Sequence, residues 1–162
     1  MKKRSGSLSF LVAGVTLALC WLMFVFFFHR PVSQILFMLG NVTAGTGVLL
    51  ILLAMRTLRK RGKLEEQGDF TETTVVVKQG IYSVVRHPLY LGWLLGYPAA
   101  MLVSQHWLVV ISGLIGMMSI VQITKRADSE LIAKFGPEYE QYIQEVPRLN
   151  IILGIARKLR GS

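Results

Sequence analysis

The 162-residue sequence has little of the side-chain chemistry that many soluble enzymes use. It contains one cysteine, Cys20, which lies inside an apolar run. A single cysteine excludes a disulfide within the chain and a metal site built from several cysteines. The sequence also lacks the GxSxG motif, the Walker loop, the GxGxxG loop and any recognisable spacing of metal ligands. It therefore gives no indication of a metal site or of the sites that those motifs build.

Acidic residues are also few. Nine Asp and Glu residues stand against 18 Lys and Arg residues, so the net charge is +9. Basic chains often bind nucleic acid, but here the aromatic residues lie in the apolar runs instead of between basic residues. The sequence is 52% hydrophobic, its mean hydropathy is +0.50, and its apolar residues occur in blocks. These features predict an all-α integral membrane protein that does not bind nucleic acid.

Long uncharged runs predict about four transmembrane helices within a single membrane domain, residues 1–162. A helix needs about 20 mainly apolar residues to cross the hydrocarbon layer. The first run could instead be a cleaved signal peptide, but it ends in three phenylalanines, which make a poor cleavage site. In the second run, small residues four apart, such as Gly40 and Ala44, predict close helix packing. The expected spans are residues 8–28, 34–55, 89–105 and 107–124.

The distribution of charge predicts the orientation. With four spans, both termini lie on one side of the membrane, and that side carries all nine carboxylates and every Lys and Arg except Arg30. The positive-inside rule makes this side the cytoplasm. We therefore expect a multi-pass protein with cytoplasmic N- and C-termini and a cytoplasmic segment at residues 64–88. A C-terminal helical region, residues 125–160, would form a cytoplasmic cap that ends in an amphipathic, surface-lying helix.

Polar side chains concentrate in residues 80–92, just before the third expected span. His87 can donate and accept hydrogen bonds near neutral pH, and Pro88 favours the start of a helix. Tyr82 and Tyr90 offer aromatic faces for a flat base or a cation. Composition alone leaves two interpretations open for this segment: an interfacial belt that anchors a helix end, or a ligand site.

The carboxylates of the C-terminal region form the second candidate group. Asp128 lies nearest the membrane end of the expected helix and could bind a ligand ammonium group. Glu130 is four residues after Arg126, which is typical of an ion pair on a solvated helix. Glu138 and Glu140 are also most simply solvated residues.

Two ordered motifs resemble the signatures of one superfamily, that of the isoprenylcysteine carboxyl methyltransferases and phospholipid methyltransferases. The first motif is Gly80-x-Tyr82-x-x-x-Arg86-His87-Pro88-x-Tyr90-x-Gly92. The second motif is Leu131-x-x-x-Phe135-Gly136-x-Glu138-Tyr139-x-x-Tyr142-x-x-x-Val146-Pro147-Arg148. The likeness covers residues 73–148, about half of the chain.

The resemblance implies an integral-membrane enzyme that uses S-adenosylmethionine and has no Rossmann fold. It implies methyl transfer at the cytoplasmic face to a lipophilic or small acceptor, such as an isoprenylcysteine carboxylate. The catalytic residues would be Arg86 and His87. The cofactor would be bound by Val76, Val77, Gly80, Tyr82, His87, Pro88, Tyr90 and Asp128.

One position departs from the family pattern. The family usually carries two adjacent glutamates before the second motif, where this sequence has Ala127 and Asp128. The resemblance therefore assigns the ammonium-binding role to Asp128, with Glu130 as a less suitable substitute. Two alternatives remain: a nicotinamide-dependent membrane enzyme similar to the sterol reductases, and a non-catalytic membrane adaptor that retains the fold.

Overall fold

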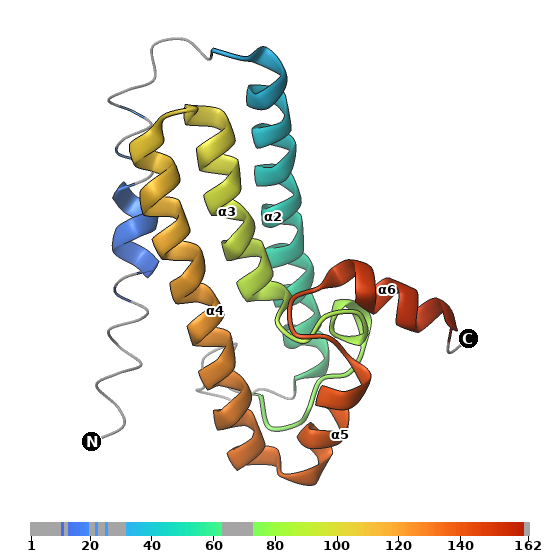
Figure 1. Ribbon diagram of the computed structural model, residues 1–162. Helices are drawn as coiled ribbons and strands as arrows, with labels where there is room; N and C mark the ends of the chain where they lie inside the picture. The colour runs from blue at the N-terminus through green and yellow to red at the C-terminus, as the bar shows by residue number, and fades with distance from the viewer. Residues whose placement is uncertain are drawn as a thin grey trace. The chain divides into compact units, whose positions relative to one another are not determined.

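The computed structural model describes residues 11, 13–19, 22, 25, 32–62 and 73–160. Helices are the regular structure of this described part, apart from one bridge residue, Thr73, so the all-α prediction is confirmed there. Figure 1 shows the helices in chain order along the colour bar. They are α2 (Gln34–Arg61), the 3₁₀ helix η1 (Gly80–Ser83), α3 (Pro88–Ser104), α4 (Trp107–Phe135), α5 (Pro137–Glu145) and α6 (Ile151–Arg160).

Two of these helices, α2 and α4, are long and apolar enough to cross a membrane. A third, α3, is apolar but shorter, and it contains Pro98. Many large apolar side chains of α2 and α4 are exposed, including Val42 and Met118, which suits helices that face lipid. Most of the expected first span, residues 8–28, lies outside the described residues, although residues 13–19 are helical. The number of four spans therefore stays a prediction.

The helices extend beyond the uncharged runs that predicted them. Helix α2 continues past the expected span end at Met55 to Arg61 and includes the basic segment. Helix α4 continues from the membrane region to Phe135, as predicted, and stops before Gly136 and Pro137. The first charged residue marks where the chain leaves hydrocarbon, but Lys and Arg are good helix formers and do not end a helix.

The chain divides into two compact units, and each is described separately. The first unit is drawn from Met1–Val48 and Gly92–Arg126. Within it, a Cβ atom added to Gly40 of α2 would lie 2.6 Å from Cγ2 of Val103 of α3. A Cβ atom on Gly47 would lie 2.9 Å from the carbonyl oxygen of Gly92. The predicted close packing of this small-residue stretch is therefore confirmed.

The second unit is drawn from Leu49–Leu91 and Ala127–Ser162. It has one buried cluster in which Ala54 and Leu58 of α2 pack with Val77 and Tyr82. A second cluster joins α4 to α5 and is formed around Tyr139, Tyr142 and Val146. Both sequence motifs lie mainly in this unit.

Main-chain hydrogen bonds join the two motifs directly. The amide of Arg86 donates to the carbonyl of Pro147 at 3.0 Å, and the amide of His87 donates to the carbonyl of Arg148 at 3.2 Å. The segment after α5 therefore lies alongside the Arg-His-Pro segment. Two parts of the chain that are far apart in sequence are fixed in register at this point.

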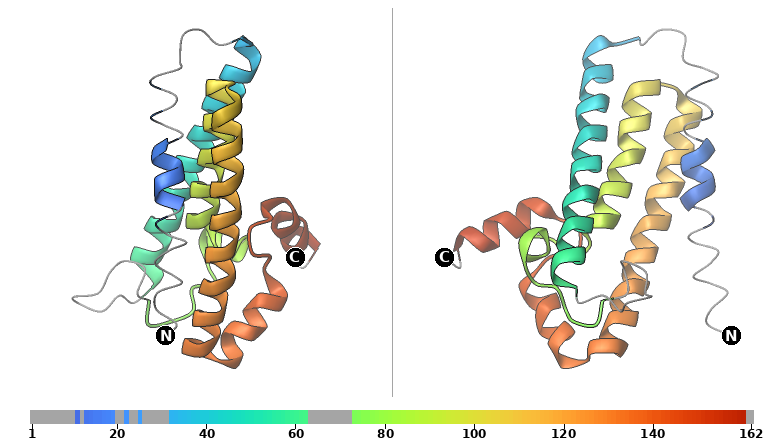
Figure 2. Two further views of the ribbon diagram at one scale, coloured as in Figure 1. Left: turned by 60° about the vertical axis from the view of Figure 1, so that its left-hand side comes forward. Right: turned by 180° about the vertical axis from the view of Figure 1, so that it is seen from behind.

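Helix α6 packs on the residue that follows η1. Figure 2 shows α5 and α6 as separate helices in both views, joined by residues 146–150. Gly154 of α6 lies so close to the carbonyl of Val84 that an added Cβ atom would collide with that oxygen. A glycine is therefore required at residue 154, and this contact holds α6 against the backbone of Val84.

Gly154→Ala is expected to lower the free energy of unfolding by about 1–3 kcal/mol, because the methyl group forces the two backbones apart. Thermal unfolding of the detergent-solubilised protein measures this loss. Gly45→Ala is the matched control, since a Cβ atom at Gly45 would meet no atom within 4 Å. This helical glycine in open space should tolerate alanine or gain stability from it. Equal unfolding temperatures for the two variants would contradict the close contact.

Candidate functional site

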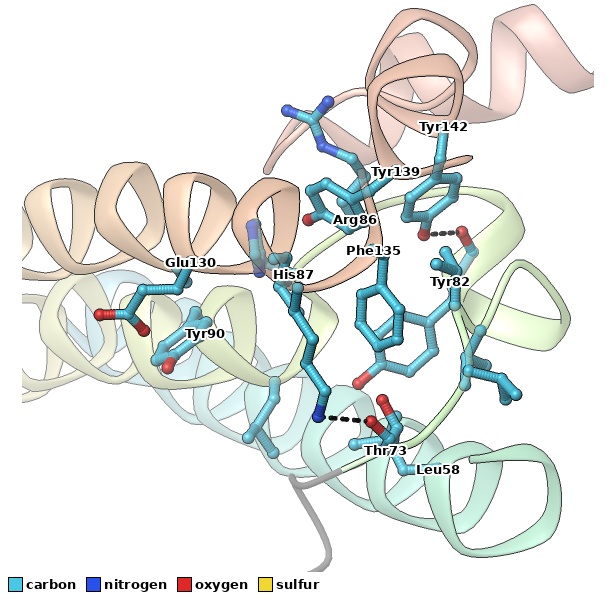
Figure 3. Close-up of a pocket in the computed structure, with 17 residues that line it drawn as sticks. Leu58, Thr73, Tyr82, Arg86, His87, Tyr90, Glu130, Phe135, Tyr139 and Tyr142 are labelled. Carbon is cyan, nitrogen blue, oxygen red and sulfur yellow. Dashed lines mark hydrogen bonds between the residues drawn. The ribbon is translucent and has the colours of Figure 1, made fainter. Parts of the chain in front are cut away.

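A cavity of about 330 Å³ lies in the second unit. This volume is within the range of pockets that bind small molecules, about 300–1,000 Å³. Side chains of both sequence motifs line it (Figure 3). The second motif contributes Leu131 and Phe135 from α4, and Tyr139 and Tyr142 from α5.

Most of the residues that the resemblance assigned to a site line this cavity. They are Val76, Val77, Tyr82, Arg86, His87 and Tyr90. Three others lie elsewhere. Gly80 faces Thr57 of α2 in a separate groove, Pro88 is fully buried at the start of α3, and Asp128 is buried beside the cavity without lining it.

Asp128 is the junction of a buried polar network. Its Oδ1 accepts hydrogen bonds from His87 Nε2 at 2.8 Å and from the Tyr139 hydroxyl at 2.9 Å. Its Oδ2 accepts from Arg148 Nε at 2.7 Å and from Arg86 Nη2 at 3.2 Å. The residue is only 4% exposed. Each carboxylate oxygen already has two donors, so Asp128 holds together groups of the protein.

The network keeps Asp128 ionised. Burial by itself would raise the pKa of this carboxyl, but hydrogen bonds from His87, Arg148 and Tyr139, together with the charge of His87, hold the pKa well below its usual range. An ionised carboxylate only accepts hydrogen bonds, so His87 donates through Nε2. The other ring nitrogen, Nδ1, carries a proton when the ring is charged and can accept one when the ring is neutral.

The tyrosines of the site are hydrogen-bond donors. Burial raises the pKa of Tyr139, and the charge of Asp128 raises it further. Burial likewise raises the pKa of Tyr142, whose hydroxyl donates to the carbonyl of Tyr82 at 2.6 Å. Both hydroxyls therefore stay protonated: Tyr142 links α5 to the first motif, and Tyr139 links α5 to Asp128 of α4.

Arg86 connects the cavity to the network. Its Nη1 donates to the carbonyl of Ile143 at 2.9 Å, and its Nη2 donates to Asp128. Its Nε is buried and has no hydrogen-bond partner within the described part of the chain. An unpaired buried N–H group is costly.

Two charged residues of α4 complete the lining, and the resemblance gave them little or no role. Glu130 lies with Tyr90 at one end of the cavity, away from the end formed by Leu58 and Thr73 (Figure 3). At that second end, Lys134 Nζ donates to the carbonyl of Thr73 at 2.8 Å. The sequence could not predict that Lys134, Thr73 and Leu58 line the cavity, because only the fold brings them there. The described residues contain no group of His, Cys, Asp and Glu that could hold a metal ion.

Comparison with known proteins identifies the family. The phospholipid methyltransferase family matches residues 35–135, which is more than half of the chain. Methanethiol S-methyltransferase 2 of Bradyrhizobium diazoefficiens is 36% identical over 70 residues, which cover 43% of this chain. The match spans 26% of that relative's length. No solved structure matches the chain. With its apolar helices and this match, the chain belongs to the phospholipid methyltransferase family of membrane methyltransferases.

Proposed function

We propose that the protein transfers a methyl group from S-adenosylmethionine to a lipophilic or small acceptor, and that the cavity binds the cofactor. One observation carries this proposal. Two motifs separated by α3 and most of α4 line a single cavity within one compact unit. An interfacial belt that merely anchored a helix end would need no such convergence.

The residues present fit the chemistry of the cofactor. Phe135 and Tyr82 offer aromatic faces on which a flat base can stack. The carboxylate of Glu130 can pair with an ammonium group. S-adenosylmethionine carries both a flat base and an ammonium group. Asp128 has no free acceptor for an ammonium group, so we assign that role to Glu130.

The bound cofactor would supply a sulfonium methyl group, which an acceptor attacks in line with the leaving sulfur. The cavity residues align the two reagents and exclude water. Asp128 fixes the ring of His87 and its tautomer. His87 Nδ1 can then take a proton from an acceptor that carries one, such as a thiol, whereas a carboxylate acceptor needs no base.

The methyl acceptor is a molecule that can reach the cavity either from the cytoplasm or from the bilayer. The similar protein from Bradyrhizobium diazoefficiens is named for methyl transfer to methanethiol, a small thiol. A thiol of this kind has to lose its proton to react, and His87 is the base that the cavity offers, whereas a carboxylate acceptor reacts without a base. We propose a multi-pass arrangement with both termini and the cavity on the cytoplasmic side, because the Lys and Arg residues gather there.

Binding of labelled S-adenosylmethionine to the purified full-length protein in lipid nanodiscs tests the proposal. Transfer of label to prenylcysteine analogues, ethanolamine lipids or small thiols then identifies the acceptor class. Binding of NADPH without binding of S-adenosylmethionine would support the reductase alternative. Cofactor binding without transfer to any of these acceptors would favour the adaptor alternative.

Phe135→Leu is expected to weaken S-adenosylmethionine binding about fivefold, since leucine keeps an apolar side chain but removes the aromatic face. Isothermal titration of the full-length protein measures the affinity. Trp107→Leu is the control, because this exposed aromatic residue begins α4 outside the cavity. An unchanged affinity in Phe135→Leu would move the base to another part of the cavity.

A further inference from the structure

A second groove, of about 480 Å³, lies between the last turns of α2 and η1 in the second unit. The α2 side is formed by Leu53, Arg56, Thr57, Lys60 and Arg61. The other side is formed by residues 79–81 and Val84. The groove and the proposed cofactor cavity share no lining residue in the described part of the chain.

The lining of the groove is basic. Among the residues that the structure describes, the lining includes three cationic side chains, Arg56, Lys60 and Arg61, and no carboxylate. All three are exposed, and the ion pairs formed within the described ranges involve other cations. Lys158 of α6 lies outside this lining and donates from Nζ to Ser83 Oγ of η1 at 2.9 Å. The groove is therefore complementary to an anion.

Apolar surface adjoins these cations. On the preceding turns of α2, Leu49 and Leu52 are more than half exposed, and Leu53 lines the groove itself. Because α2 is a candidate membrane span, this surface faces the hydrocarbon and the cations lie at headgroup level. A ligand that combines a negative head with acyl chains matches both parts, whereas a free anion matches only the first.

Glycine at residue 80 lets η1 approach α2 closely enough to form the groove. Gly80 has a φ angle of +61°, which other residues rarely adopt. A Cβ atom at this position would also lie 3.1 Å from Thr57 Oγ1. Gly80 therefore allows the close approach of η1 to α2 that forms this groove, which differs from the cofactor-binding role that the resemblance implied.

We propose that this groove binds the phosphate of an anionic membrane phospholipid, with Arg56 and Lys60 as its main contacts. Guanidinium and ammonium groups make strong, charge-assisted hydrogen bonds to phosphate oxygens. Residues 53, 56, 57 and 60 share one face of α2, so Leu53 and the cations Arg56 and Lys60 follow one another along that face of the helix. The lipid is a ligand of the groove, separate from the methyl acceptor of the cavity.

The test measures binding of acyl-labelled phosphatidylglycerol to the full-length protein in neutral detergent micelles by fluorescence anisotropy. Arg56→Gln and Lys60→Gln should each weaken binding about fivefold. Arg59→Gln is the matched control: it removes one positive charge from the same helix, but Arg59 does not line the groove. It should weaken binding less than twofold. Unchanged unfolding temperatures show that the variants fold.

Two competitors distinguish the source of the phosphate. Unlabelled phosphatidylglycerol should displace the probe, and inorganic phosphate at millimolar concentration should not. Displacement by inorganic phosphate at the same concentrations would overturn the proposal in favour of a free-anion site. An Arg59→Gln loss equal to that of Lys60→Gln would overturn it in favour of a diffuse attraction between the basic helix end and any anionic surface.

Discussion

Asp128→Asn is expected to lower the free energy of unfolding by about 3–5 kcal/mol, because it removes the one anion of a buried charged network. The amide would place its NH₂ group against donors from His87 and Tyr139 or from Arg86 and Arg148. The guanidinium of Arg86 would remain buried without its counter-ion. Thermal unfolding of the detergent-solubilised protein should show a decrease on the order of 10 °C.

Glu140→Gln provides the control for this variant. Glu140 is an exposed carboxylate of α5, and its loss should change stability by less than about 0.5 kcal/mol. Methyl transfer should also fall in Asp128→Asn, because the His87 ring loses the partner that fixes its tautomer. If both variants unfolded at the wild-type temperature, Asp128 would not be a structural junction.

The network also predicts how stability depends on pH. The pKa of Asp128 is lowered in the folded state, so its contribution is complete above the ordinary pKa of an aspartate, about 4. The contribution decreases as the pH falls below that value, because the unfolded chain then binds a proton that the folded chain resists. Wild-type protein should therefore lose part of its stability in acid. Asp128→Asn should lack this part of the loss in the same unfolding measurement.

The sequence predicted the helices better than their ends or their packing. Apolar runs located α2, α3 and α4, and Gly136 with Pro137 located the end of α4. The run could not show that α2 continues to Arg61, because charge marks the membrane boundary and does not interrupt the helix. The sequence also could not show that Gly154 contacts Val84, since that contact depends on where α6 packs in the fold.

The sequence likewise predicted some residues of the candidate site and could not predict others. The motif spacing identified Tyr82, Arg86, His87 and Tyr90, which the fold brings to one cavity. Spacing along α4 could not distinguish a carboxylate facing the cavity from one facing the protein. Asp128 and Glu130 are two residues apart, so they point to different faces of the helix. The choice between them depends on the donors that surround each, and several of these come from distant parts of the chain.

Glu130→Gln is expected to weaken S-adenosylmethionine binding about tenfold while leaving the unfolding temperature unchanged. A carboxylate paired with an ammonium group contributes about 1.5–3 kcal/mol, and the exposure of Glu130 favours the lower end of this range. Glu130 has no ion pair within the described residues, so neutralising it should not disturb the fold. Isothermal titration and thermal unfolding of the same preparation measure the two quantities.

Methylthioadenosine separates the ammonium contact from other effects, because it keeps the base and ribose but lacks the amino-acid part. Its affinity should be the same for wild-type protein and Glu130→Gln. Glu138→Gln is the matched variant, since Glu138 pairs with Lys78 at 3.7 Å and does not line the cavity. It should bind S-adenosylmethionine like the wild type. If Glu130→Gln also bound the cofactor normally, and a folded Asp128→Asn did not, the ammonium role would belong to Asp128, and the network would have to open to admit the ligand.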